Sequence, residues 1–350
     1  MLRYARQATF HPLKYVNGII KEIEAQGGRL FADSPAIEVE EREASVRIKV
    51  EGGMTVDASH AVFATNCPVN DRVTLHTKMA PYRTYAMAFT LPGGVLPDAL
   101  YWDMADPYHY IRLQPGPGGA EYLIVGGKDH KSGGADDGDI RFEALAAWIE
   151  ELVPALGREV ARWSGQVMDI IDYCRFIGLN PDSKRVFVAT GDSGQGMTHG
   201  ALAGILLKNL IVYGAAEWSD VYEPSRKPAS AAANFVSENV TAIKNFAEYL
   251  MPGELKSTDD LKPGDGGVMR KGLEKIAVSR DAEGKLHACS AVCTHVGCHV
   301  HWNSTEQCWD CPCHGSQFAP NGEVLSGPAI TPLEAAEIPG VRQAGAKVAG

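Results

Sequence analysis

The cysteines of this chain are crowded into one short window. Of eight cysteines in 350 residues, six lie between Cys289 and Cys313, with histidines among them. Burial of a lone thiol in a core explains an isolated cysteine, and we interpret Cys67 and Cys174 in that way. Core packing does not explain six cysteines in one window. This segment is therefore expected to be a metal site or a disulfide framework.

The spacing inside the window favours a centre with two metal atoms. Two loops, CTHVGC at 293–298 and CPCHGSQF at 311–318, each offer a cysteine followed by a histidine. Such loops can give one iron of a 2Fe-2S cluster two thiolates and the other iron two imidazoles. The predicted ligands are Cys293, His295, Cys311 and His314. Structural zinc is the alternative, but its motifs usually group two cysteines or two histidines. A plain disulfide domain would require secretion, for which the sequence gives no sign.

Charge and hydropathy exclude several kinds of partner. The 43 acidic and 33 basic side chains give a net charge of −10, which argues against nucleic acid and anionic membranes as partners. Apolar stretches such as GALAGILLKNLIVYGAA are too short or interrupted to form a membrane segment. The N-terminal residues show no export signal, so a cytoplasmic location is expected.

The rest of the chain alternates helical and strand-like patterns. Residues 11–27 carry apolar side chains at helical spacing, and the runs between 29 and 130 are typical of a mostly antiparallel sheet. Asp139 is expected to cap a helix that packs on this sheet. The order RVFVAT, GDSGQGMTHG, ALAGILLKNLIVYG predicts a strand, a glycine loop and a helix. We predict domains at 1–215 and 253–340, joined by a linker at 216–252 that contains the helical stretch NFVSENVTAIKNFAEYL.

The C-terminal part resembles a known family. CTHVGC, CPCHGSQF and the following NGEVLSGPA are similar to the Rieske 2Fe-2S family in its disulfide-containing branch. The resemblance implies a small all-β domain with the cluster at its tip and both histidine ligands near the surface. We predict that Cys298 and Cys313, one beside each ligand pair, form the disulfide. The remaining cysteines and histidines match no ligand position: Cys289, Cys308, His287, His299 and His301.

The first part resembles the glycine and D-amino-acid oxidase-like (DAO) FAD-dependent oxidoreductases. The resembling pieces are QATFHPLKYVNGIIKEIEAQGGRLFADS, HAVFATNCP, YHYIRL with EYLIVGGKDH, and VFVATGDSGQGMTHGALAG. The resemblance implies an α+β chain: a partial DAO-like domain with a mostly antiparallel substrate sheet, then the all-β Rieske domain. The implied flavin contacts, with Ala36 as an adenine neighbour, are Thr65, Asn66, Gly191, Asp192, Gly194, Gly196, Met197 and Thr198. No GxGxxG motif occurs in the sequence, so the chain looks N-terminally truncated and its FAD binding is open.

The resemblance also suggests a substrate class. Enzymes of this kind hold a substrate carboxylate with an arginine and aromatic hydroxyls, and the candidates on the predicted strands are Arg83, Tyr85, Tyr110 and Arg112. Equally, these side chains could form ordinary cross-strand pairs. The sequence identifies no catalytic base.

The leading hypothesis is an oxidoreductase in which FAD oxidises a small amine or amino-acid-like substrate and electrons pass through the 2Fe-2S cluster to an external acceptor. The alternative is a Rieske electron-transfer protein with a non-catalytic, degenerate flavoprotein-like domain. A Rieske oxygenase ranks last, because almost no sequence follows the Rieske segment.

Overall fold

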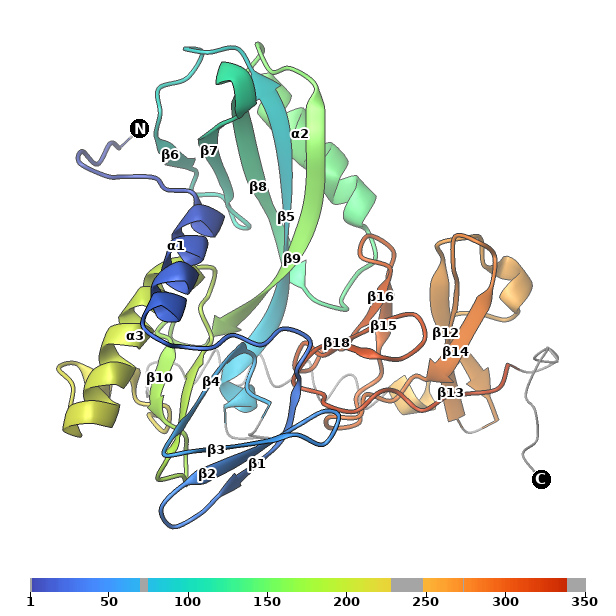
Figure 1. Cartoon of the computed structure of the whole chain (residues 1–350). Helices are drawn as coiled ribbons and strands as arrows, with labels where there is room; N and C mark the ends of the chain where they lie inside the picture. Colours follow the sequence, from blue (N-terminus) through green and yellow to red (C-terminus); the bar gives the residue numbers. More distant parts are fainter. Residues whose placement is uncertain (1, 70–74, 228–247, 273, 339–350) are drawn as a thin grey trace.

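The computed structural model describes residues 2–69, 75–227, 248–272 and 274–338 (Figure 1). A large α+β domain comes first, and a smaller all-β domain follows. The predicted linker helix at 234–250 falls mostly outside the described residues; its end forms the short 3-10 helix η4 (Glu248–Leu250).

A five-stranded antiparallel sheet is the largest element of the first domain. Its strand order is β6-β7-β8-β5-β9, and its strands pair antiparallel, which confirms the predicted mostly antiparallel sheet. Figure 1 shows α1 and α3 on one side of this sheet and α2 with the second domain on the other. The strands are β5 (Met79–Leu91), β6 (Leu100–Trp102), β7 (His109–Pro115), β8 (Glu121–Lys131) and β9 (Glu159–Ile170).

Helix α2 (Gly138–Leu152) packs on this sheet because its apolar side chains recur every three or four residues. Phe142, Leu145 and Ile149 are at most 2% exposed and join the inward residues of β5, β7 and β8 in one core. The helix begins two residues earlier than expected. Asp137 is the N-cap, and the predicted cap Asp139 lies in the first turn, where its negative charge faces the positive helix end.

Two smaller sheets complete the first domain. The first has the order β10-β11-β4, and β4 runs parallel to β11. The second is an antiparallel meander, β1-β2-β3. Helix α3 packs on β10 and β11 through a separate apolar cluster. The elements are β1 (Ala36–Glu41), β2 (Val46–Val50), β3 (Thr55–Ala58), β4 (Ala61–Asn66), β10 (Phe176–Leu179), β11 (Val186–Thr190), α3 (Gly196–Tyr213) and α4 (Ser219–Tyr222).

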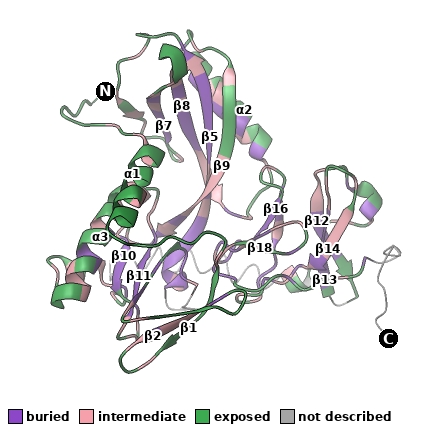
Figure 2. Ribbon diagram, in the orientation of Figure 1, coloured by how far each residue is buried: buried purple, intermediate pink, exposed green. Residues whose placement is uncertain are grey.

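Helix α1 (Pro12–Ala25) forms where its 3.6-residue periodicity predicted, but it buries no residue. Leu13 is 69% exposed, and Figure 2 shows almost the whole helix as exposed. The periodicity therefore located an apolar face, and within the described residues that face has no covering element.

The second domain consists of two antiparallel sheets, as expected for a small all-β domain. One contains β12 (Gly266–Lys271), β13 (Glu274–Arg280) and β14 (Leu286–Ser290); the other contains β15 (His301–Asn303), β16 (Cys308–Asp310), β17 (Gln317–Phe318) and β18 (Val324–Ser326). Trp309 and Phe318 are fully buried between them. The two cysteine-histidine loops leave this core next to the first domain.

Candidate functional site

The two cysteine-histidine loops have the same backbone design. In the first, the Cys293 N–H donates to the Cys298 carbonyl and the Gly297 N–H donates back to the Cys293 carbonyl, at 2.8 and 3.0 Å. In the second, Cys311, Ser316 and Gly315 repeat this pattern at the same distances. Gly297 (φ 89°) and Gly315 (φ 83°) occupy the left-handed region, which favours glycine. The sequence motif therefore specifies two matching tight turns.

Each turn aims backbone N–H groups at its cysteine sulfur. The Cys293 sulfur receives the N–H groups of His295 and Val296, and the Cys311 sulfur receives those of Cys313 and His314. A hydrogen bond with Cys311 and these N–H groups lower the pKa of Cys293 to about 7. Such donors favour thiolates, the form that binds iron.

The four predicted ligands converge. Cys293 and Cys311 are free thiols, 2% and 1% exposed, and hydrogen bond to each other. The rings of His295 and His314 lie edge to face with their centroids 5.0 Å apart. Burial lowers the pKa of His314 to about 3, which keeps its imidazole neutral as a metal ligand must be. Two thiols beside two neutral imidazoles fit the donor set of a 2Fe-2S cluster with mixed ligation.

The predicted disulfide between Cys298 and Cys313 is present and joins the two loops. Cys289 and Cys308 are buried free thiols. Burial raises the pKa of both, that of Cys289 to about 12, which suits inert core positions rather than ligands.

The histidine side of the site faces the first domain. His76, in the 3-10 helix η1 (His76–Lys78), places its ring 4.7 Å from the His295 ring and 5.3 Å from the His314 ring, centroid to centroid. The Cys67 thiol donates to the His314 carbonyl at 3.5 Å. Sequence reasoning missed both residues: it treated Cys67 as core packing only, and no motif surrounds His76. These contacts cover a surface that the Rieske resemblance placed near solvent.

An ion pair buried between the two domains holds this arrangement. The Arg83 guanidinium binds both carboxylate oxygens of Asp310 at 3.1 and 2.9 Å, and both side chains are 3% exposed. It also donates to the Ser164 hydroxyl at 2.8 Å. Gln166 adds a hydrogen bond to the Gly315 carbonyl at 2.8 Å. Arg83, predicted as a carboxylate anchor for substrate, thus has an internal carboxylate as its partner.

The candidate flavin contacts meet at the carboxyl ends of two parallel strands. Asn66 ends β4, and its carbonyl accepts a hydrogen bond from the Thr190 hydroxyl at the end of β11. Asn66 (φ 62°) adopts a left-handed conformation at the end of β4, and Gly191 (φ 68°) and Gly194 (φ 77°) do so just before α3 begins. Ligands of open parallel sheets bind at this edge, so the residues present fit one end of a flavin. The dinucleotide motif GxGxxG is not part of the sequence.

A mostly apolar hollow of about 260 Å³ lies along β4. Ala36 and Thr65, two residues that the family resemblance linked to the flavin, both line this hollow. Among the described strands, β4 is the outer strand of its sheet.

The four substrate candidates divide between the two faces of the large sheet. Arg83, Tyr85 and the buried Met87 are at every second position of β5 and therefore share the face toward α2. The Tyr85 hydroxyl lies 3.0 Å from His130 Nε2. Tyr110 and Arg112 point to the other face. There Arg112 donates to the Phe10 carbonyl, and its Nε is buried without a hydrogen-bond partner in the described part of the chain. Only the second pair remains suited to an external carboxylate.

Asp129 is a further polar group on that second face, and it was not predicted. It follows an irregularity of β8, where Gly127 (φ 145°) and Lys128 (φ 61°) break the register with β5. The Thr84 side chain bonds to both Asp129 and Tyr110. Asp129 Oδ1 is buried and has no partner among the described residues, and burial raises the pKa of this carboxyl group. The glycine pair in EYLIVGGKDH was the available signal.

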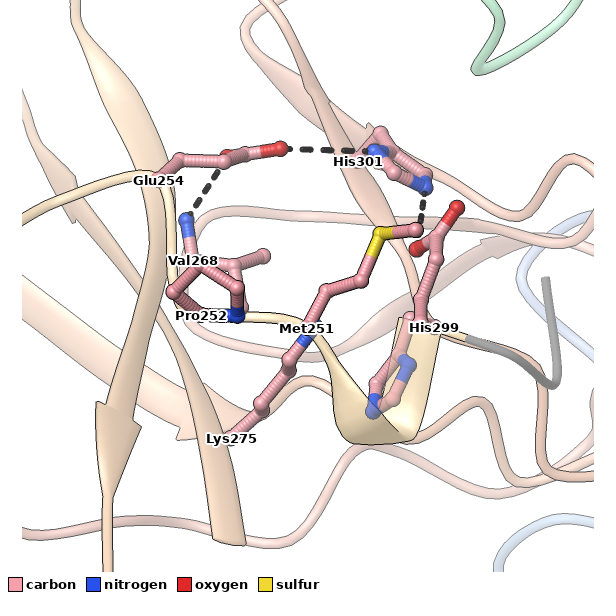
Figure 3. A pocket seen from close by; sticks show the side chains of 8 residues that line it. Met251, Pro252, Glu254, Val268, Lys275, His299 and His301 are labelled. Carbon is pink, nitrogen blue, oxygen red and sulfur yellow. Dashed lines mark hydrogen bonds and ion pairs between the residues drawn. The ribbon is translucent and has the colours of Figure 1, made fainter.

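A second cavity, about 220 Å³, lies within the Rieske region (Figure 3). His301 stands between two carboxylates, with Nε2 3.2 Å from Glu248 and Nδ1 3.5 Å from Glu254. The centroids of the His299 and Tyr249 rings are 4.1 Å apart. The Tyr249 hydroxyl donates to the Gly297 carbonyl at 2.5 Å. No group of side chains in the described ranges forms a metal site here. These contacts attach η4 to the first cluster loop.

Comparison with known proteins identifies the class. Residues 1–210 match the FAD dependent oxidoreductase family (DAO), and residues 252–338 match the Rieske [2Fe-2S] domain. The chain belongs to the FAD dependent oxidoreductase family and carries a Rieske domain after its flavoprotein part. The family uses FAD, the Rieske domain binds a 2Fe-2S cluster, and the combination makes this a redox protein.

Individual relatives agree with this assignment. The chain is 30% identical over 334 residues to a protein described as the Rieske 2Fe-2S iron-sulfur protein YhfW of Bacillus subtilis; the match covers 94% of this chain and 64% of that protein. A cytochrome b6-f complex iron-sulfur subunit of Chlorobaculum thiosulfatiphilum is 34% identical over 104 residues, 27% of this chain and 58% of that subunit.

A solved structure shares the fold of the larger domain. The L-proline dehydrogenase of P. horikoshii superposes with a TM-score of 0.50 at 15% identity, over 61% of this chain and 59% of that one. The chain thus spans less than two thirds of the length of these relatives. Among the helices that the structure describes, none is long and apolar enough to cross a membrane.

Proposed function

We propose that this protein oxidises a small amine or amino-acid-like substrate with FAD and passes the electrons singly to its Rieske cluster and on to an external acceptor. One observation carries the proposal: Cys67, which directly follows the predicted flavin contacts Thr65 and Asn66, touches the backbone of the cluster ligand His314. The end of β4 that carries the predicted flavin contacts therefore lies beside the histidine side of the cluster site.

The chemistry of each site supports this order of events. FAD, when bound, accepts a hydride from substrate, and the cluster takes one electron at a time. Two imidazoles in place of two thiolates make the cluster less negative than an all-cysteine one, so its potential should lie well above the roughly −400 mV of plant-type ferredoxins.

The substrate class follows from the sheet face that carries Tyr110 and Arg112. Arg112 Nε offers a buried donor suited to a carboxylate, and Asp129 Oδ1 offers a buried acceptor suited to an ammonium or hydroxyl group. Tyr108 lies beside the glycine loop, since a Cβ added to Gly194 would be 4.0 Å from its hydroxyl. The solved L-proline dehydrogenase makes L-proline a reasonable first substrate to test.

The test has two stages on the cluster-loaded chain. FAD is first titrated in while its fluorescence is followed; L-proline, glycine and sarcosine are then added without oxygen. The proposal predicts bleaching of the flavin followed by the EPR signal of the reduced cluster. Arg112→Met should weaken substrate binding, whereas Arg162→Met, on the exposed part of β9, should not.

A pure electron carrier is the second candidate, and the missing GxGxxG motif favours it. It predicts a chain that binds no FAD and still cycles its cluster between the oxidised and reduced forms with chemical reagents. FAD binding with a 1:1 endpoint would exclude this candidate.

A further inference from the structure

We propose that His76 closes the histidine side of the cluster, so that water and small diffusible reductants do not reach the two imidazole ligands from that side. This goes beyond the proposed function: it depends on the cluster ligands alone and holds whether or not FAD or an amine binds. His76 is a positioning residue here, since it touches the ligands and not the metal.

The geometry shows three rings packed on one another. The planes of His76 and His295 meet at 66°, those of His76 and His314 at 64°, and those of His295 and His314 at 87°. His76 is 1% exposed, and both ring nitrogens of His295 are buried. The His76 ring therefore covers one side of both ligand rings, while His295 and His314 each remain partly exposed on other sides.

The position of His76 is fixed from its own side. The residue before it, Leu75, is fully buried, and the Cys67 sulfur lies 3.7 Å from His76 Nδ1. Two residues later, the Lys78 ammonium donates to the carbonyls of Pro224 and Arg226 at 2.9 and 3.0 Å. A segment held at both ends by buried contacts keeps its ring in place, whereas a loop side chain free to swing would not form a closed surface.

The position is also fixed from the cluster side. The Arg83–Asp310 ion pair joins the large domain to the residue directly before the ligand Cys311, and the Gln166 side chain binds Gly315, directly after the ligand His314. A Cβ added to Gly315 would lie only 2.7 Å from the Gln166 side chain and 2.9 Å from Pro81, so the loop packs closely on this surface and leaves no space for a side chain there. Contacts from both domains thus fix the three rings relative to one another.

The test measures access to the cluster rather than turnover. The reduced cluster is examined by pulsed EPR in D₂O, where the deuterium modulation reports nearby exchangeable water. The oxidised cluster is mixed with ascorbate, and the rate of its reduction is followed by absorbance. His76→Ala should deepen the deuterium modulation and speed reduction several-fold. His76→Phe keeps an aromatic ring in place and should stay close to the parent protein.

Two further variants complete the test. His109→Phe is the matched control, because His109 is also a buried histidine of the large domain, 5% exposed, but its ring stacks on Trp148 of α2 and not on the ligand rings. It should change neither measurement. If His76→Ala fails to retain its cluster, Arg83→Met is used instead. This variant loosens the contact between the domains and should increase the access of water and ascorbate to the cluster. A folded, cluster-loaded His76→Ala or Arg83→Met protein with the access of the parent, or an equal change in His109→Phe, would overturn the proposal.

Discussion

The cluster site and the flavin region of this molecule are built in different ways. All four cluster donors, and the backbone N–H groups that face their sulfurs, come from two loops within residues 293–314. The candidate flavin contacts come from the region where β4 and β11 end, and these strands pair although β5 to β9, which lie between them in the sequence, form a separate sheet. A local site tolerates changes elsewhere, whereas a dispersed site depends on the whole domain.

The surface between the two regions combines both kinds of construction. Its cluster side is local, but its partners Cys67, His76 and Arg83 belong to the large domain. Changes on the two sides of this surface should therefore have separable effects, and the following experiments separate them in order of decreasing effect.

The largest effect is expected from Cys293→Ser. Because a 2Fe-2S cluster needs all four ligands, this variant should lose the visible absorbance and the EPR signal of the cluster completely. The far-UV circular dichroism of the large domain should persist, since the site is local. Cys289→Ser is the matched control: Cys289 is fully buried in the same domain but is no ligand, and its variant should keep the cluster. A cluster that survives Cys293→Ser would remove this residue from the ligand set.

A smaller effect is expected from Arg83→Met. Removing one partner of a buried ion pair leaves the other charge uncompensated, which typically lowers the free energy of unfolding by about 3 kcal/mol or more. The loss should appear as a lower midpoint of urea unfolding, followed by circular dichroism and by cluster absorbance. Arg162→Met breaks the exposed pair with Glu159 and should cost less than about 1 kcal/mol. Equal losses in both variants would show that the domain contact adds no stability.

The smallest effect concerns pH and the attachment of η4. Burial alone would lower the pKa of His301, but Glu248 and Glu254 outweigh it and raise the pKa to about 9. A raised pKa means that the contribution of His301 to stability is complete below pH 6.5 and is lost as the pH rises toward 9. His301→Phe should flatten the pH dependence of the unfolding midpoint in that window.

Neighbouring His299 provides the contrast. Burial first, and then Lys275, lower its pKa to about 4, so its contribution is present above pH 6.5 and is lost as the pH falls toward 4. Glu248 and His301 are the other charged groups that act on it. His299→Phe should therefore change only the acidic limb of the stability curve. An alkaline effect of His299→Phe, or an acidic effect of His301→Phe, would contradict this assignment.

The sequence was sufficient for the local features and not for the contacts between domains. CTHVGC and CPCHGSQF contain their own turns, so the ligands and the disulfide could be predicted from spacing. Arg83 could not be assigned, because its partner Asp310 lies 227 residues away. Cys67 and His76 were missed for the same reason. The apolar face of α1 was predicted from periodicity, but periodicity carries no information about which element covers it.

The faces of the large sheet are an intermediate case. Alternation along a strand indicates which of its side chains share a face, but only the sheet register shows that Tyr110 faces away from Tyr85. The register also reveals the irregularity that brings Asp129 to the face of Tyr110.

The decisive question is whether the two loops hold a 2Fe-2S cluster through two cysteines and two histidines. Iron and acid-labile sulfide should be measured on anaerobically purified protein, and the nitrogen couplings of the reduced cluster by pulsed EPR. We expect two irons and two sulfides per chain and strong coupling to two histidine nitrogens. Zinc in place of iron, absent sulfide, or a cluster without histidine coupling would contradict it.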